Sequence, residues 1–181
     1  MDKPIIVNVA GKAQHGKDTF AQYLVEYLYK EHGKKIQILH LADGVKEVAR
    51  RVGWDGEKDQ NGRALLQFIG TEWGRDQIGK DVWVREVKKK IHEDTDVVIL
   101  PDTRFVNEIS YWIEHGYIAK PVKVVRLDEA GNEWDNGMGD KLQNHSSETE
   151  IDNFPFPDVI HHQTLEDLKT LAKNFGKRLV K

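Results

Sequence analysis

The chain has 181 residues, a net charge of −3 and no cysteine. This length suits one domain with a buried core, and a hydrophobic fraction of 39% with 31% charged residues is typical of a globular protein. The charge gives no reason to expect strong attraction to a nucleic-acid polymer or an anionic membrane. The missing cysteines exclude disulfides and thiolate–metal sites. Because the N-terminal apolar run is too short for a signal peptide or a membrane span, we expect a cytoplasmic protein.

Strands and helices alternate along the first half of the chain. Residues 4–9 (PIIVNV) form the β-branched run that is typical of a strand buried on both faces. Apolar residues recur at helical spacing from 17 to 31, and Gly33 ends this helix. The pattern then predicts a strand over 36–41, a helix over about 45–52, a polar loop over 54–62, helices over about 63–78 and 82–92, and a strand over 96–100.

The alternation continues with a helix over about 107–115, a strand over 121–127, a weak strand over 158–160 and a closing helix over 165–179. This order predicts an α/β fold with a parallel sheet, helices on both faces and right-handed crossovers. Ligands of such sheets bind at the carboxyl ends of the strands. Residues 128–146 are polar and contain three glycines, and we expect so long a stretch to form a lid loop.

A glycine-rich segment follows the first strand and opens the first helix with the spacing G-x-x-x-x-G-K. Its glycines let backbone N–H groups turn toward phosphate oxygens, and the helix N-terminus adds its positive dipole end. Lys17 supplies a charge for the transferred phosphoryl group. We interpret the segment as a P-loop whose ATP contacts come from Gly11, Ala13, Gln14, His15, Gly16, Lys17, Asp18 and Thr19.

The residue after the P-loop lysine departs from the usual pattern. Asp18 stands where a serine or threonine is usual, and Thr19 comes one position later. A displaced threonine is common in nucleoside monophosphate kinases and favours a small-molecule kinase. Two interpretations of Asp18 stay open, since it either helps Thr19 to hold Mg²⁺ or only caps the helix.

The strand over 96–100 ends in Pro101 and Asp102. An apolar strand followed by a carboxylate is the layout of a Walker B element, in which the acid orients hydrated Mg²⁺. Asp102 is therefore predicted to join Asp18 and Thr19 at the metal. Arg104 and Glu108 follow at the same rim, and the structural alternative is a capped turn with an Arg104–Glu108 ion pair.

Two further segments carry candidate acceptor residues. Asp43 and Lys46 lie where the second strand meets its helix; we expect Asp43 to be the N-cap and retain both as substrate contacts. Gln67, Thr71 and Arg75 follow at i, i+4 and i+8 and share one helical face. Gly70 and Gly74 flank that face, which would let a ligand approach, and the planar fork of Arg75 suits a phosphate. The alternative is a solvated surface face.

Histidine and tryptophan give weaker signals. The eight histidines show no metal-ligand spacing, so we predict no zinc site. The tryptophans are expected mainly in the core or at its rim, and only Trp83 is retained as a residue that borders a base.

Together these segments resemble the phage-type deoxynucleoside monophosphate kinases. The matching pieces are GKAQHGKDT, LADGVKE, LLQFIGTEWGRD with DVW, PDTRFVNE and HSSE, which occur in that family's order from residue 5 to about 150. The resemblance implies a three-layer P-loop kinase fold with a five-stranded parallel sheet, ATP and Mg²⁺ as cosubstrates, and phosphorylation of a deoxynucleoside monophosphate to the diphosphate. It implies one domain over 1–181, with acceptor-binding helices over about 43–92 and a lid over about 128–146.

The same resemblance implies catalytic roles for Lys17, Arg75, Asp102 and Arg104. It places acceptor contacts at Gln67, Arg75, Arg104, Asn107 and Glu108, and we add His145 and Glu148 from HSSE. The chain departs from the family in having Gly44-Val45 where a proline and a leucine are frequent. It also has no arginine between 127 and 177, so Arg126, Lys141 or more distant residues must neutralise phosphate charge, and Arg126 is taken as an ATP contact.

Two other functions stay open. One is another small-molecule P-loop kinase, such as one that acts on dephospho-coenzyme A. The other is a regulatory module that binds nucleotide without transfer, against which Arg75 and Arg104 argue because a switch needs no second phosphate site. We expect small nucleotides as partners, and the base preference and a homodimer are left open.

Overall fold

The computed structural model describes residues 3–135 and 150–180. The chain divides into two compact units, which we call the sheet unit (residues 1–38 and 92–181) and the helical unit (residues 39–91). The helical unit corresponds closely to the predicted acceptor-binding region. Within the described residues, no helix is long and apolar enough to cross a membrane.

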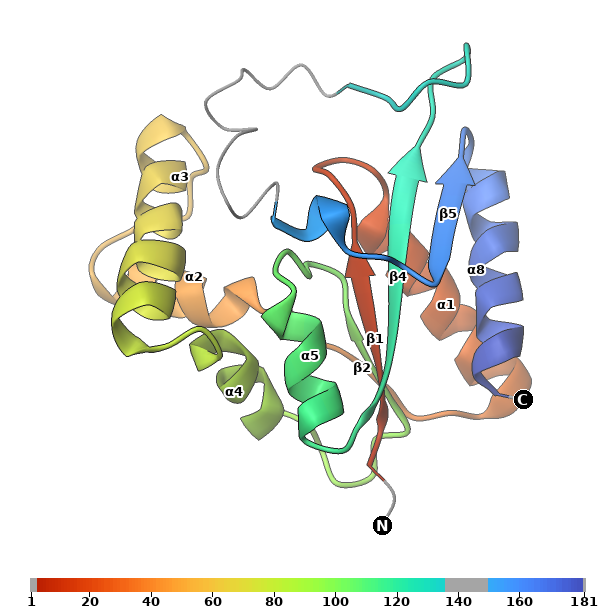
Figure 1. The fold of residues 1–181 in the computed structure, drawn as a ribbon, viewed down its shortest axis with the longest axis horizontal. Helices are drawn as coiled ribbons and strands as arrows, with labels where there is room; N and C mark the ends of the chain where they lie inside the picture. Colours follow the sequence, from red (N-terminus) through yellow and green to blue (C-terminus); the bar gives the residue numbers. More distant parts are fainter. Residues whose placement is uncertain (1–2, 136–149, 181) are drawn as a thin grey trace. The chain divides into compact units, whose positions relative to one another are not determined.

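A five-stranded sheet forms the centre of the sheet unit (Figure 1). Its strand order is β2-β3-β1-β4-β5, and each neighbouring pair is parallel, as the alternating pattern predicts. The strands are β1 (Ile5–Ala10), β2 (Ile36–Ile38), β3 (Val97–Leu100), β4 (Ile118–Arg126) and β5 (Asp158–His162).

Helices cover both faces of this sheet (Figure 1). Helices α1 (Lys17–His32) and α8 (Leu165–Leu179) pack on the face that Val7 and Val9 of β1 present. Ala10 points to the opposite face and packs with Ile109 of α5 (Asn107–Glu114). The sequence prediction of a three-layer α/β fold is therefore confirmed, and the central strand is buried on both sides as its apolar run indicated.

Three strand boundaries differ from the prediction by two residues or more. β2 ends at Ile38, β4 begins at Ile118, and β5 extends to His162. The polar end of β5 hid its last two pairs from hydrophobic periodicity, because a ladder needs only backbone groups: Val125 pairs with His161 and Arg126 with His162.

The helical unit contains α2 (Ala42–Arg51), α3 (Gln60–Gln67), the π-helix η1 (Phe68–Ile78) and α4 (Val82–Lys89). Its core is small and forms around the indole of Trp83, which packs with Val45, Ala49 and Ile69. The unit thus has a core of its own, built only from helices.

The helix predicted over 63–78 differs in two ways. It begins at Gln60 because the Asp59 side chain accepts a hydrogen bond from the backbone N–H of Gly62, so the polar loop is shorter than expected. After Gln67 the helix widens to π geometry, and the Gly79 N–H donates to the Gly74 carbonyl at 3.1 Å. Two glycines in this segment weaken the competing α-helix, and π-helical turns occur frequently at functional sites.

Candidate phosphate-binding site

The segment between β1 and α1 has the backbone of a phosphate-binding loop. Gly11 and Gly16 have φ angles of +142° and +87°, and Gln14 also lies in the left-handed region at +64°. A Cβ atom on Gly11 would lie 2.3 Å from the Val124 carbonyl oxygen, so only glycine fits there. The loop therefore passes close against β4 and turns its backbone into the N-terminus of α1, where an anion is favoured.

Lys17 lies in the first turn of α1 and is buried. Its Nζ donates a 2.8 Å hydrogen bond to the Lys12 carbonyl across the loop. Burial, followed by the positive charge of Arg104, lowers the pKa of Lys17 to about 8, and the carboxylates of Asp18 and Asp102 act in the opposite sense. A buried cation with one carbonyl partner is prepared to accept an anionic ligand.

The end of β3 brings a second set of charges to the same place. Asp102 and Arg104 act electrostatically on Lys17, so the P-loop and the predicted Walker B segment meet, as adjacent parallel strands require. Burial lowers the pKa of Arg104, and the carboxylates of Asp102 and Glu108 raise it. The guanidinium stays charged at neutral pH. The arrangement places two cations and one carboxylate beside the loop.

Glu108 has a structural role in this turn. Its Oε2 accepts hydrogen bonds from the backbone N–H groups of Arg104 and Phe105, at 2.7 and 3.1 Å. The Asn8 amide donates to the Glu108 carbonyl and to the Thr103 hydroxyl, which ties β1 to the turn. The turn after β3 is therefore capped by Glu108, as the structural alternative proposed. These hydrogen bonds hold the backbone at Arg104 in place. Asn107, predicted to contact the acceptor, is the first residue of α5.

The loop residues fit a hydrated Mg²⁺ ion. This ion takes one or two carboxylates together with phosphate oxygens and water, and Asp18 and Asp102 both interact electrostatically with Lys17. The N-cap of α1 is Gly16, without a side-chain capping bond, so Asp18 is not the helix cap. Within residues 3–135 and 150–180, no three His, Asp or Glu side chains gather to form a metal site by themselves.

The first residues of the predicted lid loop, 128–134, are held by hydrogen bonds close to the end of β4. Asp128 accepts a hydrogen bond from the Asn132 N–H, Leu127 bridges Glu133, and the Trp134 N–H donates to the Arg126 carbonyl at 2.9 Å. The Arg126 guanidinium lies 4.4 Å from the centre of the Trp134 ring. Residues 127–134 therefore form an ordered turn, which we call the β4 turn, and the rest of the predicted lid, with Lys141, His145 and Glu148, lies outside the described residues.

Sequence reasoning named His15 as an ATP contact but missed the contacts that hold the loop in place. His15 is buried and bonds to the β4 turn, and His162 of β5 donates to the His15 carbonyl at 2.9 Å. The Lys12 ammonium pairs with Glu133 at 3.0 Å. The only sequence signal for His162 was its place in the pair His161-His162 at the end of a strand. The spacing of residues along the chain does not indicate that His162 contacts His15.

In the helical unit, Asp43 is not the N-cap that was predicted. α2 begins at Ala42 after Leu41, and Asp43 lies in the first turn with its carboxylate 3.2 Å from the Lys46 ammonium. The two candidates therefore pair with each other. As a partly exposed i,i+3 pair they contribute little stability, which leaves both groups available to a ligand.

Arg75 is buried within η1, with 6% of its surface exposed. Gln67 and Thr71 are half-buried, whereas Phe68, Glu72 and Asp76 beside them are exposed. The burial of Arg75 argues against a fully solvated face at this position, whereas Gln67 and Thr71 stay partly exposed. A buried guanidinium is costly unless charge or hydrogen bonds compensate it.

Trp83 differs from its predicted contact with a base. The indole is 6% exposed, and its Nε1 donates to the Gly70 carbonyl at 2.8 Å. A Cβ on Gly44 or Gly74 would lie 2.9 or 2.6 Å from this ring. The two glycines therefore make room for Trp83, and the expectation that Gly74 lets a ligand approach is replaced by a packing role.

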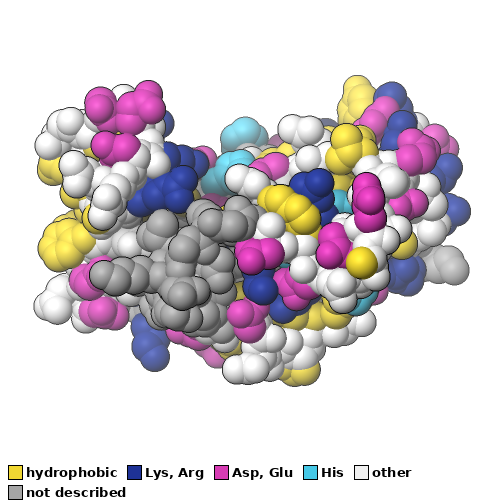
Figure 2. All heavy atoms as spheres, turned by 90° about the horizontal axis from the view of Figure 1, so that it is seen from above, with side chains coloured by type: hydrophobic (Ala, Val, Ile, Leu, Met, Phe, Trp, Pro, Cys, Tyr) yellow, Lys and Arg dark blue, Asp and Glu magenta, His cyan; other side chains and the backbone are white. Residues whose placement is uncertain are grey.

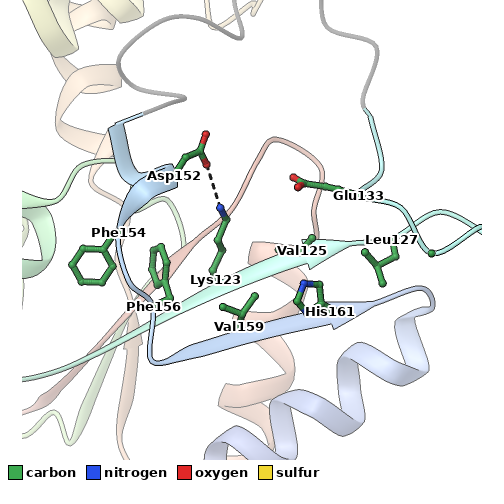
Figure 3. A pocket seen from close by; sticks show the side chains of 10 residues that line it. Lys123, Val125, Leu127, Glu133, Asp152, Phe154, Phe156, Val159 and His161 are labelled. Carbon is green, nitrogen blue, oxygen red and sulfur yellow. Dashed lines mark hydrogen bonds and ion pairs between the residues drawn. The ribbon is translucent and has the colours of Figure 1, made fainter.

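A pocket of about 500 Å³ lies on the other side of β4 and β5 from α1 and α8 (Figure 3). Val125 and Val159 form part of its floor, the Phe154 and Phe156 rings stand at one end, and Lys123 pairs with Asp152 at 3.3 Å. None of its lining residues belongs to the P-loop, so we keep the candidate site at the loop.

Acidic and basic side chains are interspersed on the coloured part of the face in Figure 2.

No protein-family model matches the chain, and no curated protein matches it. Among solved structures, the chain is similar to a mutant of the Mycobacterium tuberculosis APS kinase CysC, with 10% identity, a TM-score of 0.47 and full coverage of both chains. It is also similar to a protein called APE1195, with 16% identity and a TM-score of 0.47 over 100% of this chain and 99% of that one.

Proposed function

We propose that this chain transfers the γ-phosphoryl group of ATP to a deoxynucleoside monophosphate. The observation that carries the proposal is the buried Lys17, which lies in a loop with positive-φ glycines at a helix N-terminus and beside Asp102 and Arg104. This combination suits the β- and γ-phosphates of a nucleotide.

Phosphoryl transfer asks the protein mainly for alignment and charge neutralisation. Lys17 and Arg104 supply two positive charges where the terminal phosphate would lie, and the fixed turn around Glu108 holds Arg104 in place. A phosphate acceptor oxygen is already a competent nucleophile, so no general base is needed. Bound Mg²⁺ would neutralise phosphate charge, with Asp18, Thr19 and Asp102 as the residues that fit it.

The acceptor class has separate support in the helical unit. Arg75 is a buried guanidinium with a geometry suited to phosphate, and it shares a polar face with Gln67 and Thr71. The segments LLQFIGTEWGRD and PDTRFVNE resemble the phage-type kinases of deoxynucleoside monophosphates. A second phosphate-binding group favours a transferase over a module that only binds nucleotide.

The test is a coupled assay of ATP consumption with Mg²⁺, run with each ribo- and deoxynucleoside monophosphate, with dephospho-coenzyme A and without acceptor. We expect deoxynucleoside monophosphates to accelerate consumption, and Lys17→Ala to abolish the acceleration. Lys30→Ala, an exposed lysine on the same helix α1, is the matched control. Stimulation by dephospho-coenzyme A alone would favour that alternative, and a rate that no acceptor raises would refute the proposal.

A further inference from the structure

The P-loop of this chain is held from outside by a buried histidine. His15 has 1% of its surface exposed. Its Nε2 lies 3.1 Å from the Trp134 carbonyl oxygen, and its Nδ1 lies 3.3 Å from the Arg126 backbone nitrogen. One side chain of the loop thus contacts the last residue of β4 and the last residue of the β4 turn.

These two partners determine the protonation of the ring. A carbonyl oxygen only accepts, so Nε2 must carry a hydrogen; the Arg126 N–H only donates, so Nδ1 must be bare. His15 is therefore the neutral Nε2–H tautomer. Burial, which lowers the pKa of His15, agrees with a neutral ring, as do the nearby ammonium groups of Lys12 and Lys17, while Glu133 and the Trp134 carbonyl act in the opposite sense.

Independent contacts hold the same parts together. The Trp134 N–H donates a hydrogen bond to the Arg126 carbonyl, and the Arg126 guanidinium lies over the Trp134 ring. In addition, the His15 backbone carbonyl accepts a hydrogen bond from His162, and Lys12 pairs with Glu133 of the β4 turn. The His15 ring is the buried centre of this arrangement.

We propose that His15 is a positioning residue, which ties the β4 turn to the P-loop and so holds Arg126 and Trp134 beside the nucleotide that the loop binds. The role of His15 in ATP binding rests on the proposed function. The link that the His15 ring forms between the P-loop and the β4 turn, which we call the tie, does not. Since the position of the turn depends on the position of the loop, ATP that orders the loop also orders the turn, and loss of the tie weakens ATP binding before it affects the acceptor.

The tie is tested first without any activity. Nitrogen NMR of the imidazole rings at pH 7.5 should show His15 protonated on Nε2 and bare on Nδ1. In His15→Ala, the amide of Arg126 should exchange with solvent about three- to ten-fold faster, the range expected for one lost hydrogen bond. His92→Ala, an exposed histidine of the same unit, should change nothing. An Nδ1–H tautomer, or an unchanged Arg126 exchange rate, would overturn the tie.

The role in binding is tested by kinetics and by two partial replacements. Asparagine places an acceptor near Nδ1, and glutamine places a donor near Nε2, so each variant keeps one contact. We expect the KM for ATP to rise about three- to ten-fold in His15→Ala and less in His15→Gln or His15→Asn, with the acceptor KM unchanged.

The outcomes separate the two proposals. A residue needed only for folding would lower the active fraction, and hence the apparent kcat, at an unchanged KM for ATP; that result would overturn the positioning role. Urea unfolding of each variant measures the folded fraction. If wild-type protein consumes no ATP, the proposed function fails, and the tie is still decided by the exchange rates.

Discussion

The two units use glycine for different purposes. In the sheet unit, Gly11 and Gly16 adopt positive φ angles and bring the loop backbone against β4 and β5. In the helical unit, Gly44 and Gly74 keep ordinary helical angles and leave space for the indole of Trp83. Both pairs stand beside charged residues in the sequence, so the sequence context alone does not separate them.

This difference teaches how a glycine near polar residues should be interpreted. A glycine at positive φ shapes the backbone and exposes N–H groups, which suits an anion. A glycine at helical φ leaves the space of a side chain empty, and a neighbouring group can pack there. At Gly44 and Gly74 that group is the indole of Trp83.

The largest expected effect is at the loop of the sheet unit. Lys17→Ala should lower the transfer rate by a factor of ~10²–10³, the usual loss when one group that stabilises the transition-state charge is removed. The fold should persist, because Lys17 contributes a single hydrogen bond within the loop. Steady-state kinetics together with urea unfolding check both statements. Wild-type turnover in this variant would refute the P-loop assignment.

Arg75→Lys tests the polar face of the helical unit. The variant keeps the charge but loses the bidentate fork. We expect kcat/KM for the acceptor to fall by about one to two orders of magnitude, equivalent to roughly 1.5–3 kcal/mol for a charge-assisted hydrogen bond, with ATP affinity nearly unchanged. Arg85→Lys, an exposed arginine of the same unit, is the control. If the variant instead binds ATP more weakly and has normal acceptor kinetics, Arg75 contacts ATP and not the acceptor.

Gly74→Ala tests whether this glycine makes room for Trp83. The added Cβ would lie 2.6 Å from the indole and 2.7 Å from the Ile69 carbonyl, so overpacking should cost roughly 1–3 kcal/mol of unfolding free energy. At Gly70 the nearest atom is 3.6 Å away, and Gly70→Ala should be neutral or slightly stabilising. Urea unfolding measures the unfolding free energy of both variants. Equal stability of the two would contradict the packing role of Gly74.

The smallest effect is a pH dependence in the sheet unit. The lowered pKa of Lys17, about 8, means that the ammonium loses its proton as the pH rises through this value. The kcat/KM for ATP, which reports groups of the free enzyme, should therefore be halved near pH 8 and fall further above it. Lys17→Arg, which keeps its charge at this pH, should lack this decline if it retains activity. A flat wild-type profile up to pH 9 would contradict the shift.

The sheet could be predicted because its signals are local. The run from Ile5 to Ala10 is buried on both faces, and the spacing of Phe20, Leu24 and Leu28 follows one helix face. The meeting of Lys17 with Asp102 also followed from sequence, since parallel strands end at the same edge. The start of α3 was missed because Asn61 and Gly62 are poor helix formers, although Asp59 offered a capping signal.

The parts that sequence did not predict depend on contacts between distant residues. His15, Trp134 and His162 meet because β1, β4 and β5 lie next to one another, and no spacing along the chain encodes hydrogen bonds across this distance. The burial of Arg75 and the packing of Trp83 against Gly74 depend likewise on which helices come together in a unit without a repeating pattern.

The way the chain leaves and re-enters the sheet has a consequence for how such a protein diversifies. β2 and β3 are neighbours, and the Gln37 side chain accepts hydrogen bonds from the His92 N–H and the Thr95 hydroxyl, so the exit and return points of residues 39–91 are pinned together. A segment with adjacent ends can change in length or be exchanged without cutting a strand, and the entropy of closing it grows only slowly with length. The helical unit can therefore vary in sequence and length during evolution while the strands of the sheet unit stay unchanged.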